Sequence, residues 1–186
     1  MVESIIVTLF PVLFLIVLFG GGALARRKNI DMDGAPPIDR KLFYISKYSI
    51  VILWAAMALR SWGVDLPFIR VPEPLSRFAL CLWIVGFALL FIGRFGLGTF
   101  FRIGSPKEDT GLVTDGIFRL SRNPMYVGVY ATIVASILYT LNPIVFFLGL
   151  FVIAVHHRIV VAEEQFVLKE FGTTYADYCA RVRRYV

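Results

Sequence analysis

Five stretches of apolar residues, separated by shorter polar segments, dominate the pattern of hydrophobic and polar positions along the chain. A helix needs about 20 apolar residues to cross the hydrocarbon core of a bilayer. Each of the five stretches reaches or approaches that length. We therefore expect five membrane-crossing helices, which cover residues 5–24, 42–59, 78–93, 125–141 and 143–161.

The last two apolar stretches are joined only by Asn142 and Pro143. An Asn-Pro pair favours a turn, and proline is well suited to the first position of a helix. We expect these two helices to form a tight hairpin. Such a hairpin returns the polar residues before the fourth helix and those after the fifth to the same face of the membrane.

Composition agrees with this class of protein. The 186 residues are 58% hydrophobic and only 17% charged, whereas about a quarter of the residues in a soluble domain are charged. Only two cysteines occur, Cys81 and Cys179, and they indicate neither a disulfide framework nor a metal motif. The sequence therefore predicts an all-α integral membrane protein.

The net charge of +6 does not indicate a nucleic-acid partner. The basic residues gather at the ends of the apolar stretches, where they meet anionic lipid headgroups. They are concentrated after the first, third and fifth stretches. Because Lys and Arg favour the cytoplasmic side, we expect the N-terminus outside and the C-terminus and the candidate site in the cytoplasm; for a bacterial protein the membrane would be the inner one.

The first apolar stretch has two interpretations. It ends in Ala23-Leu24-Ala25, which resembles a signal-peptide cleavage site. A signal peptide, however, starts with a basic segment. Here the first four residues are Met1, Val2, Glu3 and Ser4, and the bases follow the stretch. The pattern favours a first membrane helix over a cleaved signal peptide.

The segment from about residue 96 to 123 does not resemble a flexible linker. Apolar residues alternate in it with turn-forming Gly, Thr and Asp, so we expect it to fold against the helices. In the C-terminal tail, Gly172 is placed to end a helix, and Tyr175 and Tyr178 have the spacing of one helix face. We divide the chain into an N-terminal part, 1–93, and a C-terminal half, 94–186, that carries the candidate chemistry.

A polar cluster precedes the fourth expected helix, within Arg122 to Gly128. Pro124 fixes its own φ and favours an extended Asn123, so the amide of Asn123 lies at a defined point before the helix. The N–H groups of a helix N-terminus suit a carboxylate, and Tyr126 adds a phenol. An interfacial anchor, with Arg on phosphate and Tyr in the aromatic belt, explains the same residues.

Glu163 and Glu164 follow the fifth expected helix, where carboxylates oppose the helix dipole. Such a carboxylate suits the hydroxyls of a ribose or a ligand ammonium; two solvated acids are the alternative. The adjacent His156 and His157 point about 100° apart, which is poor metal-ligand geometry, so we expect no metal.

Arg158 suits an anionic substrate group or, by snorkelling, lipid headgroups. It lies five positions before Glu163, so an unbroken helix does not place the two on one face. A bend near residues 160 and 161 would be needed to bring them together.

Taken together, these residues resemble the isoprenylcysteine carboxyl methyltransferase family and the related membrane phospholipid methyltransferases. The resemblance covers about residues 94–184. The segments that carry it are Leu112 to Phe118, Arg122 to Gly128, Asn142-Pro143, Glu163-Glu164, Phe171-Gly172 and Tyr175 to Tyr178.

The resemblance implies a methyltransferase that uses S-adenosyl-L-methionine and acts on a lipophilic small molecule or lipid within the membrane. Tyr126 and Arg158 would be its catalytic residues. The cofactor-binding residues that it implies are Thr110, Gly111, Leu112, Val113, Phe118, Asn123, Pro124, Met125, Tyr126 and Glu163.

Two positions depart from the family pattern. Asn123 replaces a histidine, and an amide can donate and accept hydrogen bonds but cannot take a charge. Ile159 stands where the isoprenylcysteine enzymes have a carboxylate-binding arginine, which leaves the acceptor open among an isoprenylcysteine-like carboxylate, a phospholipid and another lipophile. Two further hypotheses are a sterol-reductase-like NADPH enzyme and a non-catalytic membrane scaffold.

Overall fold

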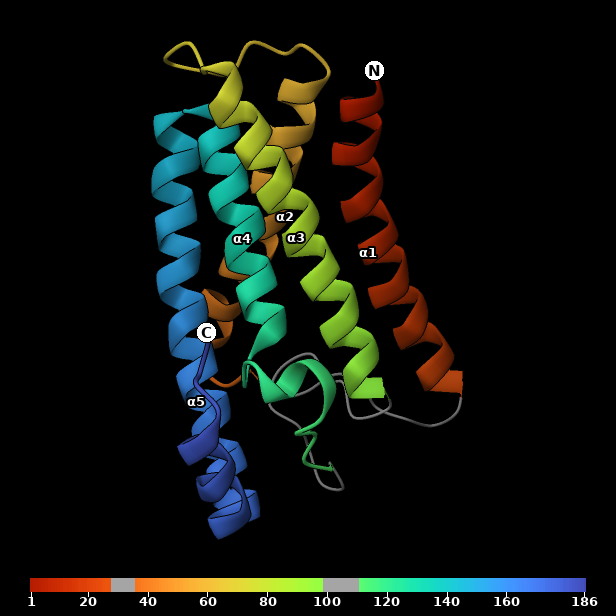
Figure 1. Cartoon of the computed structure of the whole chain (residues 1–186), viewed down its shortest axis with the longest axis vertical. Coiled ribbons are helices and arrows are strands. Elements are labelled where there is room, and N and C mark those ends of the chain that lie inside the picture. The colour runs from red at the N-terminus through yellow and green to blue at the C-terminus, as the bar shows by residue number, and fades with distance from the viewer. Residues whose placement is uncertain (28–35, 99–110) are drawn as a thin grey trace.

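The computed structural model describes residues 1–27, 36–98 and 111–186. The described residues form five helices, one 3-10 turn and the loops that connect them, and they contain no strand. In Figure 1 the long helices run side by side along the long axis of the molecule. The elements are α1 (Val2–Arg27), α2 (Arg40–Ser61), α3 (Glu73–Leu97), η2 (Gly116–Arg119), α4 (Pro124–Thr140) and α5 (Pro143–Arg181).

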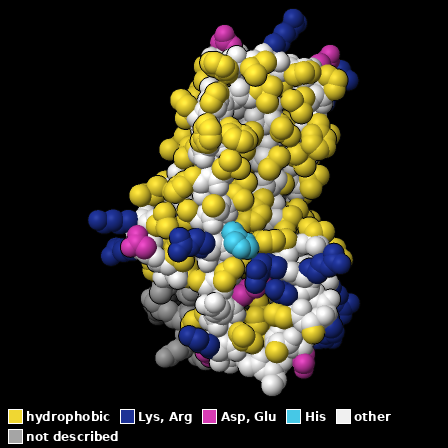
Figure 2. All heavy atoms as spheres, turned by 90° about the vertical axis from the view of Figure 1, so that its left-hand side faces the viewer, with side chains coloured by type: hydrophobic (Ala, Val, Ile, Leu, Met, Phe, Trp, Pro, Cys, Tyr) yellow, Lys and Arg dark blue, Asp and Glu magenta, His cyan; other side chains and the backbone are white. Residues whose placement is uncertain are grey.

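The five helices coincide with the five apolar stretches. Helices α1, α2, α3 and α5 are long and apolar enough to cross a membrane, and α4 is a shorter apolar helix of 17 residues. In Figure 2 hydrophobic side chains cover the upper half of the molecule, while charged side chains gather in the lower half and at the opposite tip. The chain is thus an all-helical integral membrane protein.

The α4–α5 hairpin has the turn that the sequence predicts. Leu141 adopts a left-handed conformation, with φ 40° and ψ 41°. The Asn142 side chain accepts hydrogen bonds from the backbone N–H groups of Ile144 and Val145, and its amide donates to the Leu66 carbonyl at 2.7 Å. The turn therefore caps α5 and returns the start of α4 and the later part of α5 to one end of the bundle (Figure 1).

Helices α3 and α4 touch through their backbones. A Cβ atom added to Gly86 would lie 2.9 Å from the Gly128 carbonyl oxygen, and one added to Gly128 would lie 2.6 Å from the Gly86 carbonyl oxygen. Small residues permit such close approach of membrane helices. This contact fixes the position of α4, and with it the residues at its N-terminus.

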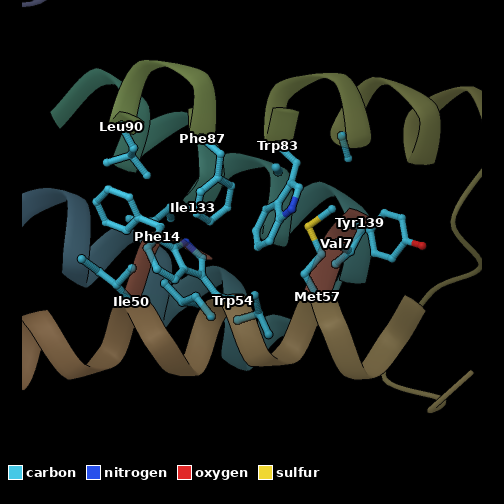
Figure 3. Packing of buried hydrophobic residues seen from close by; sticks show 14 of the residues in the cluster. Val7, Phe14, Ile50, Trp54, Met57, Trp83, Phe87, Leu90, Ile133 and Tyr139 are labelled. Atoms are coloured by element: carbon cyan, nitrogen blue, oxygen red, sulfur yellow. The ribbon is translucent and has the colours of Figure 1, made fainter. Parts of the chain in front are cut away.

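Aromatic side chains fill the core between α1, α2 and α3 (Figure 3). The Phe87 ring centroid lies 5.0 Å from that of Trp54 and 4.9 Å from that of Trp83. The buried indole N–H of Trp54 donates to the hydroxyl of Thr132 on α4 at 2.9 Å. Because a buried polar group needs a partner, this bond fixes the rotation of α2 against α4.

Helix α5 continues well beyond the membrane-length part that the sequence predicts. It stays helical through residues 160 and 161 and changes direction only at Gly172, which has φ 53° and ψ −124°. The prediction that Gly172 ends a helical segment is confirmed. The bend near residue 160 is absent, so Arg158 and Glu163 do not share a helix face.

Candidate active site

An ionic cluster at the lower end of the bundle joins the start of α4 to α5 and the C-terminal tail. Arg122 donates to both carboxylate oxygens of Glu164, at 3.0 and 3.2 Å. Its remaining nitrogen donates to the carbonyls of Cys179 and Val182, at 3.3 and 2.7 Å. A guanidinium fork matches a carboxylate in this way, so one side chain holds three segments together.

Asn123 and Arg184 complete this cluster, which we call the carboxylate clamp (Arg122, Asn123, Glu164 and Arg184). The Asn123 amide donates to Glu164 at 2.8 Å and to the Arg184 carbonyl at 3.2 Å, and Arg184 Nε donates to Glu164 at 2.8 Å. Asn123 occupies the N-cap position of α4 without a side-chain capping bond. Its amide therefore serves the clamp.

The clamp is enclosed as well as charged. The side chains of Arg122 and Glu164 are each only 11% exposed. Burial lowers the pKa of Arg122, but the hydrogen bonds and charge of Glu164 outweigh it and raise the pKa overall. Arg122 thus stays protonated. The alternative of a solvated acid is wrong for Glu164.

Glu163 lies on a different face of α5 and has a neutral partner. The Tyr126 hydroxyl donates to a Glu163 carboxylate oxygen at 2.9 Å. Tyr126 also packs against a small cluster of Phe43, Val155 and Ile159, and its ring centroid lies 6.0 Å from that of His156. The hairpin therefore brings the phenol at the start of α4 directly to the carboxylate of α5.

Met125, next to Tyr126 at the α4 N-terminus, faces α3 instead. Pro124 is buried. A Cβ atom added to Gly93 would lie 2.5 Å from the Met125 side chain, so Met125 packs against α3. Successive helix positions differ by about 100°, which explains why Met125 and Tyr126 reach different neighbours.

The segment before α4 carries the remaining predicted cofactor residues. Gly111 is exposed, whereas Leu112 and Val113 are partly buried; Thr110 lies outside the described residues. Phe118 is 5% exposed, and its ring lies 3.2 Å from a Cβ atom added to Gly96. This part of the segment folds against α3, as its composition predicts.

The tail helix supports the same segment. The Tyr178 hydroxyl donates to the Phe118 carbonyl at 2.6 Å. Tyr175 and Tyr178 are both buried, with ring centroids 5.9 Å apart. The prediction that these two tyrosines lie on one helix face is confirmed.

The structure brings Asn123, Tyr126 and Glu163 to one end of the bundle and leaves Arg158 exposed on α5. Sequence reasoning missed the part played by the last residues. The Arg183 carbonyl accepts from the Arg122 backbone N–H at 3.0 Å, and Arg184 joins the clamp. No pattern in the tail sequence distinguishes these arginines from residues that face lipid headgroups.

The same region matches a known family. A sequence model of phospholipid methyltransferases matches residues 75–174, more than half of the chain. The chain belongs to the phospholipid methyltransferase family. The matched region includes Asn123, Tyr126, Glu163 and Glu164. It ends before Arg184, the clamp residue that comes from the C-terminal tail.

A solved structure shares the fold of this family member. It is the eukaryotic intramembrane Ras methyltransferase ICMT (isoprenylcysteine carboxyl methyltransferase), with a TM-score of 0.55 and 22% sequence identity. The similarity covers 79% of this chain and 53% of ICMT, so the chain spans about half the length of that protein. A search of curated proteins gives no match.

Proposed function

We propose that this member of the phospholipid methyltransferase family is a membrane-embedded enzyme that transfers a methyl group from S-adenosyl-L-methionine to a lipophilic acceptor. The observation that carries the proposal is the contact between Tyr126 and Glu163. It lies inside the family-matched region, at the end of the bundle where charged side chains gather (Figure 2). An interfacial anchor explains a tyrosine at this depth but not a phenol directed at a carboxylate.

The residues at this end suit the cofactor. S-adenosyl-L-methionine presents ribose hydroxyls, an ammonium and a sulfonium, and a carboxylate accepts from or attracts each of them. The Glu163 carboxylate accepts from a neutral phenol, whereas Glu164 is already paired with two arginines. We therefore assign cofactor binding to Glu163 and Tyr126. Leu112 and Val113 would wall the cofactor from the loop side.

The described residues favour an acceptor other than an isoprenylcysteine carboxylate. Ile159, at the position of the expected arginine, is 2% exposed and packs with Phe43 and Val155. Arg158 is exposed on α5 and remains our candidate for an anionic group that approaches from outside the helix bundle.

The cofactor supplies an activated methyl group, so the protein mainly has to position the reactants. Holding an acceptor atom in line with the methyl carbon removes much of the entropic barrier. Tyr126 fixes the Glu163 carboxylate, and the clamp fixes the segment that carries Tyr126. Apolar packing of Tyr126 against Phe43 and Ile159 excludes water from one side of the site.

Titration calorimetry on the purified protein in nanodiscs tests this proposal. We expect micromolar binding of S-adenosyl-L-methionine and of S-adenosylhomocysteine, and loss of that binding in Glu163→Gln. NADPH should give no heat. Binding of NADPH alone would favour a reductase, and binding of none of the three would favour a scaffold; either result would overturn the proposal.

A further inference from the structure

A groove separates α4 from α5 on the side away from α3. Its volume is about 550 Å³, within the range of roughly 300–1,000 Å³ that is typical of small-molecule sites. One side of it is open to the surroundings. The residues that line it are Val127, Tyr130, Ile153, Ala154, His157, Tyr185 and Val186.

The polar groups of this groove form one hydrogen-bonded set. The Tyr185 hydroxyl lies 2.8 Å from Nδ1 of His157 and 3.4 Å from the Tyr130 hydroxyl. The Tyr185 ring also packs against both, with centroid distances of 5.5 Å to Tyr130 and 6.0 Å to His157. The rest of the lining is apolar. The groove is therefore amphipathic, with two phenols and an imidazole as its polar part.

The groove continues from the candidate active site. Tyr130 lies one helical turn after Tyr126 on α4, so the two side chains project from the same face. Tyr185 contacts Tyr130 and His157 and directly follows Arg184 of the clamp in the chain. A ligand in the groove would thus have one end within a helical turn of the Tyr126–Glu163 pair.

We infer that the groove binds the single hydrocarbon chain of the methyl acceptor and that Tyr130, His157 and Tyr185 recognise an uncharged polar group on it. This inference rests on the proposed function and names its substrate class. The volume of about 550 Å³ is within the range of sites that hold one small molecule, so we assign the groove a single hydrocarbon chain. No Lys, Arg, Asp or Glu side chain lines the groove, so none of these side chains would pair with a charged group there, and we assign the groove an uncharged one.

A photoactivatable analogue of hexadecanol, with a diazirine in its chain, tests the site directly. The protein is labelled in nanodiscs and the modified peptides are identified by mass spectrometry. We expect labelling to concentrate on peptides of α4 and α5 that contain lining residues. Excess hexadecanol should compete, and excess hexadecanoate should compete at least tenfold less well because its head is charged.

Two variants make the test specific. Ala154→Trp fills the groove from an exposed position and should reduce specific labelling at least tenfold. Ala55→Trp, the same change at an exposed position of α2, should leave labelling unchanged. Tyr185→Phe keeps the ring but removes the hydroxyl, and it should weaken competition by hexadecanol about fivefold, the effect of about one hydrogen bond.

Each result has a defined meaning. The inference would be overturned if the Ala154→Trp variant and the wild-type protein were labelled equally. It would also be overturned if the whole lipid-facing surface were labelled uniformly. Crosslinks between two copies of the chain through position 154 would also overturn it, because a protein surface would then fill the groove. If the wild-type protein did not bind S-adenosyl-L-methionine but its groove was still labelled, the proposed methyltransferase function would be overturned instead.

Discussion

Glu163 and Glu164 are neighbours in the sequence but occupy opposite environments. Glu164 is held by the guanidinium groups of Arg122 and Arg184 and by the amide of Asn123. Glu163 accepts from the neutral phenol of Tyr126, beside an apolar cluster. The rotation of about 100° between successive helix positions is enough to direct the two carboxylates toward different parts of the molecule.

Under the proposed function, this difference separates a carboxylate that stabilises the fold from one that binds the cofactor. A carboxylate whose charge is already neutralised by two arginines contributes little further attraction to a ligand. A carboxylate whose hydrogen-bond partner is a neutral phenol is not ion-paired through that bond, so it can still accept a cationic ligand. We therefore expect substitutions at the clamp to change stability and substitutions at the Tyr126–Glu163 pair to change cofactor affinity.

The largest expected effect is on folding. Glu164→Ala leaves Arg122 without its carboxylate in a site where its side chain is 11% exposed, and breaking a buried ion pair from one side costs about 3–5 kcal/mol. The free energy of unfolding, measured by denaturant titration in mixed micelles, should fall by that amount. Glu73→Ala, which breaks the exposed pair with Arg77, is the control and should cost under about 1 kcal/mol. Equal losses in the two variants would contradict a structural role for Glu164.

The next effect is on cofactor binding. Glu163→Gln keeps the shape of the side chain but removes its charge, so the Kd for S-adenosyl-L-methionine should rise at least tenfold, or about 1.4 kcal/mol. The free energy of unfolding should change by less than about 1 kcal/mol, because the partner of Glu163 is neutral. Calorimetry and denaturant titration on the same preparation measure both. A stability loss as large as that of Glu164→Ala would remove the distinction between the two carboxylates.

A smaller effect is expected at the phenol. Tyr126→Phe removes the hydrogen bond to Glu163 and keeps the packing on Phe43 and Ile159, so the Kd should rise about fivefold, the effect of one hydrogen bond. If Tyr126 acts by holding the carboxylate, the double variant with Glu163→Gln should bind no more weakly than Glu163→Gln alone. Additive losses would show that Tyr126 acts independently of Glu163.

The smallest effect is expected at Asn123. Asn123→His restores the residue that the family pattern has at this position, and an imidazole N–H can replace the amide as a donor to Glu164. Stability should stay within about 1 kcal/mol, and the Kd for S-adenosyl-L-methionine should change less than threefold. Asn123→Ala lacks a donor and should lose about 1–2 kcal/mol of stability. If Asn123→Ala lost more binding free energy for S-adenosyl-L-methionine than free energy of unfolding, Asn123 would be a direct cofactor contact.

Much of the fold could be predicted because it follows from local rules. The length of the apolar stretches located the helices, and the Asn142-Pro143 pair located the hairpin that brings Tyr126 and Glu163 together. Gly172 was a recognisable helix end, because glycine adopts a positive φ without a steric penalty. The convergence of the candidate site followed from these features alone.

The remaining features depend on contacts between distant residues. Hydropathy indicates where a helix leaves the membrane but not where it ends, so the continuation of α5 past residue 161 was missed. The sequence shows that Glu163 and Glu164 must point in different directions from a helix. It does not show which of the two pairs with arginines. Arg184 belongs to the clamp only because the chain reverses at Gly172 and returns to the start of α4, and no local pattern encodes that return.

The contact between Gly86 and Gly128 limits how the protein can admit a molecule from the lipid. Because the two helices approach backbone to backbone at this point, α3 and α4 should move together as one unit. Entry from the lipid between α3 and α4 is then disfavoured, whereas the boundary of α4 with α5, which carries the groove, is a route that this contact leaves open. Gly128→Ala inserts a methyl group into the contact between α3 and α4. It would tilt α4 away from α3 and so alter the boundary between α4 and α5.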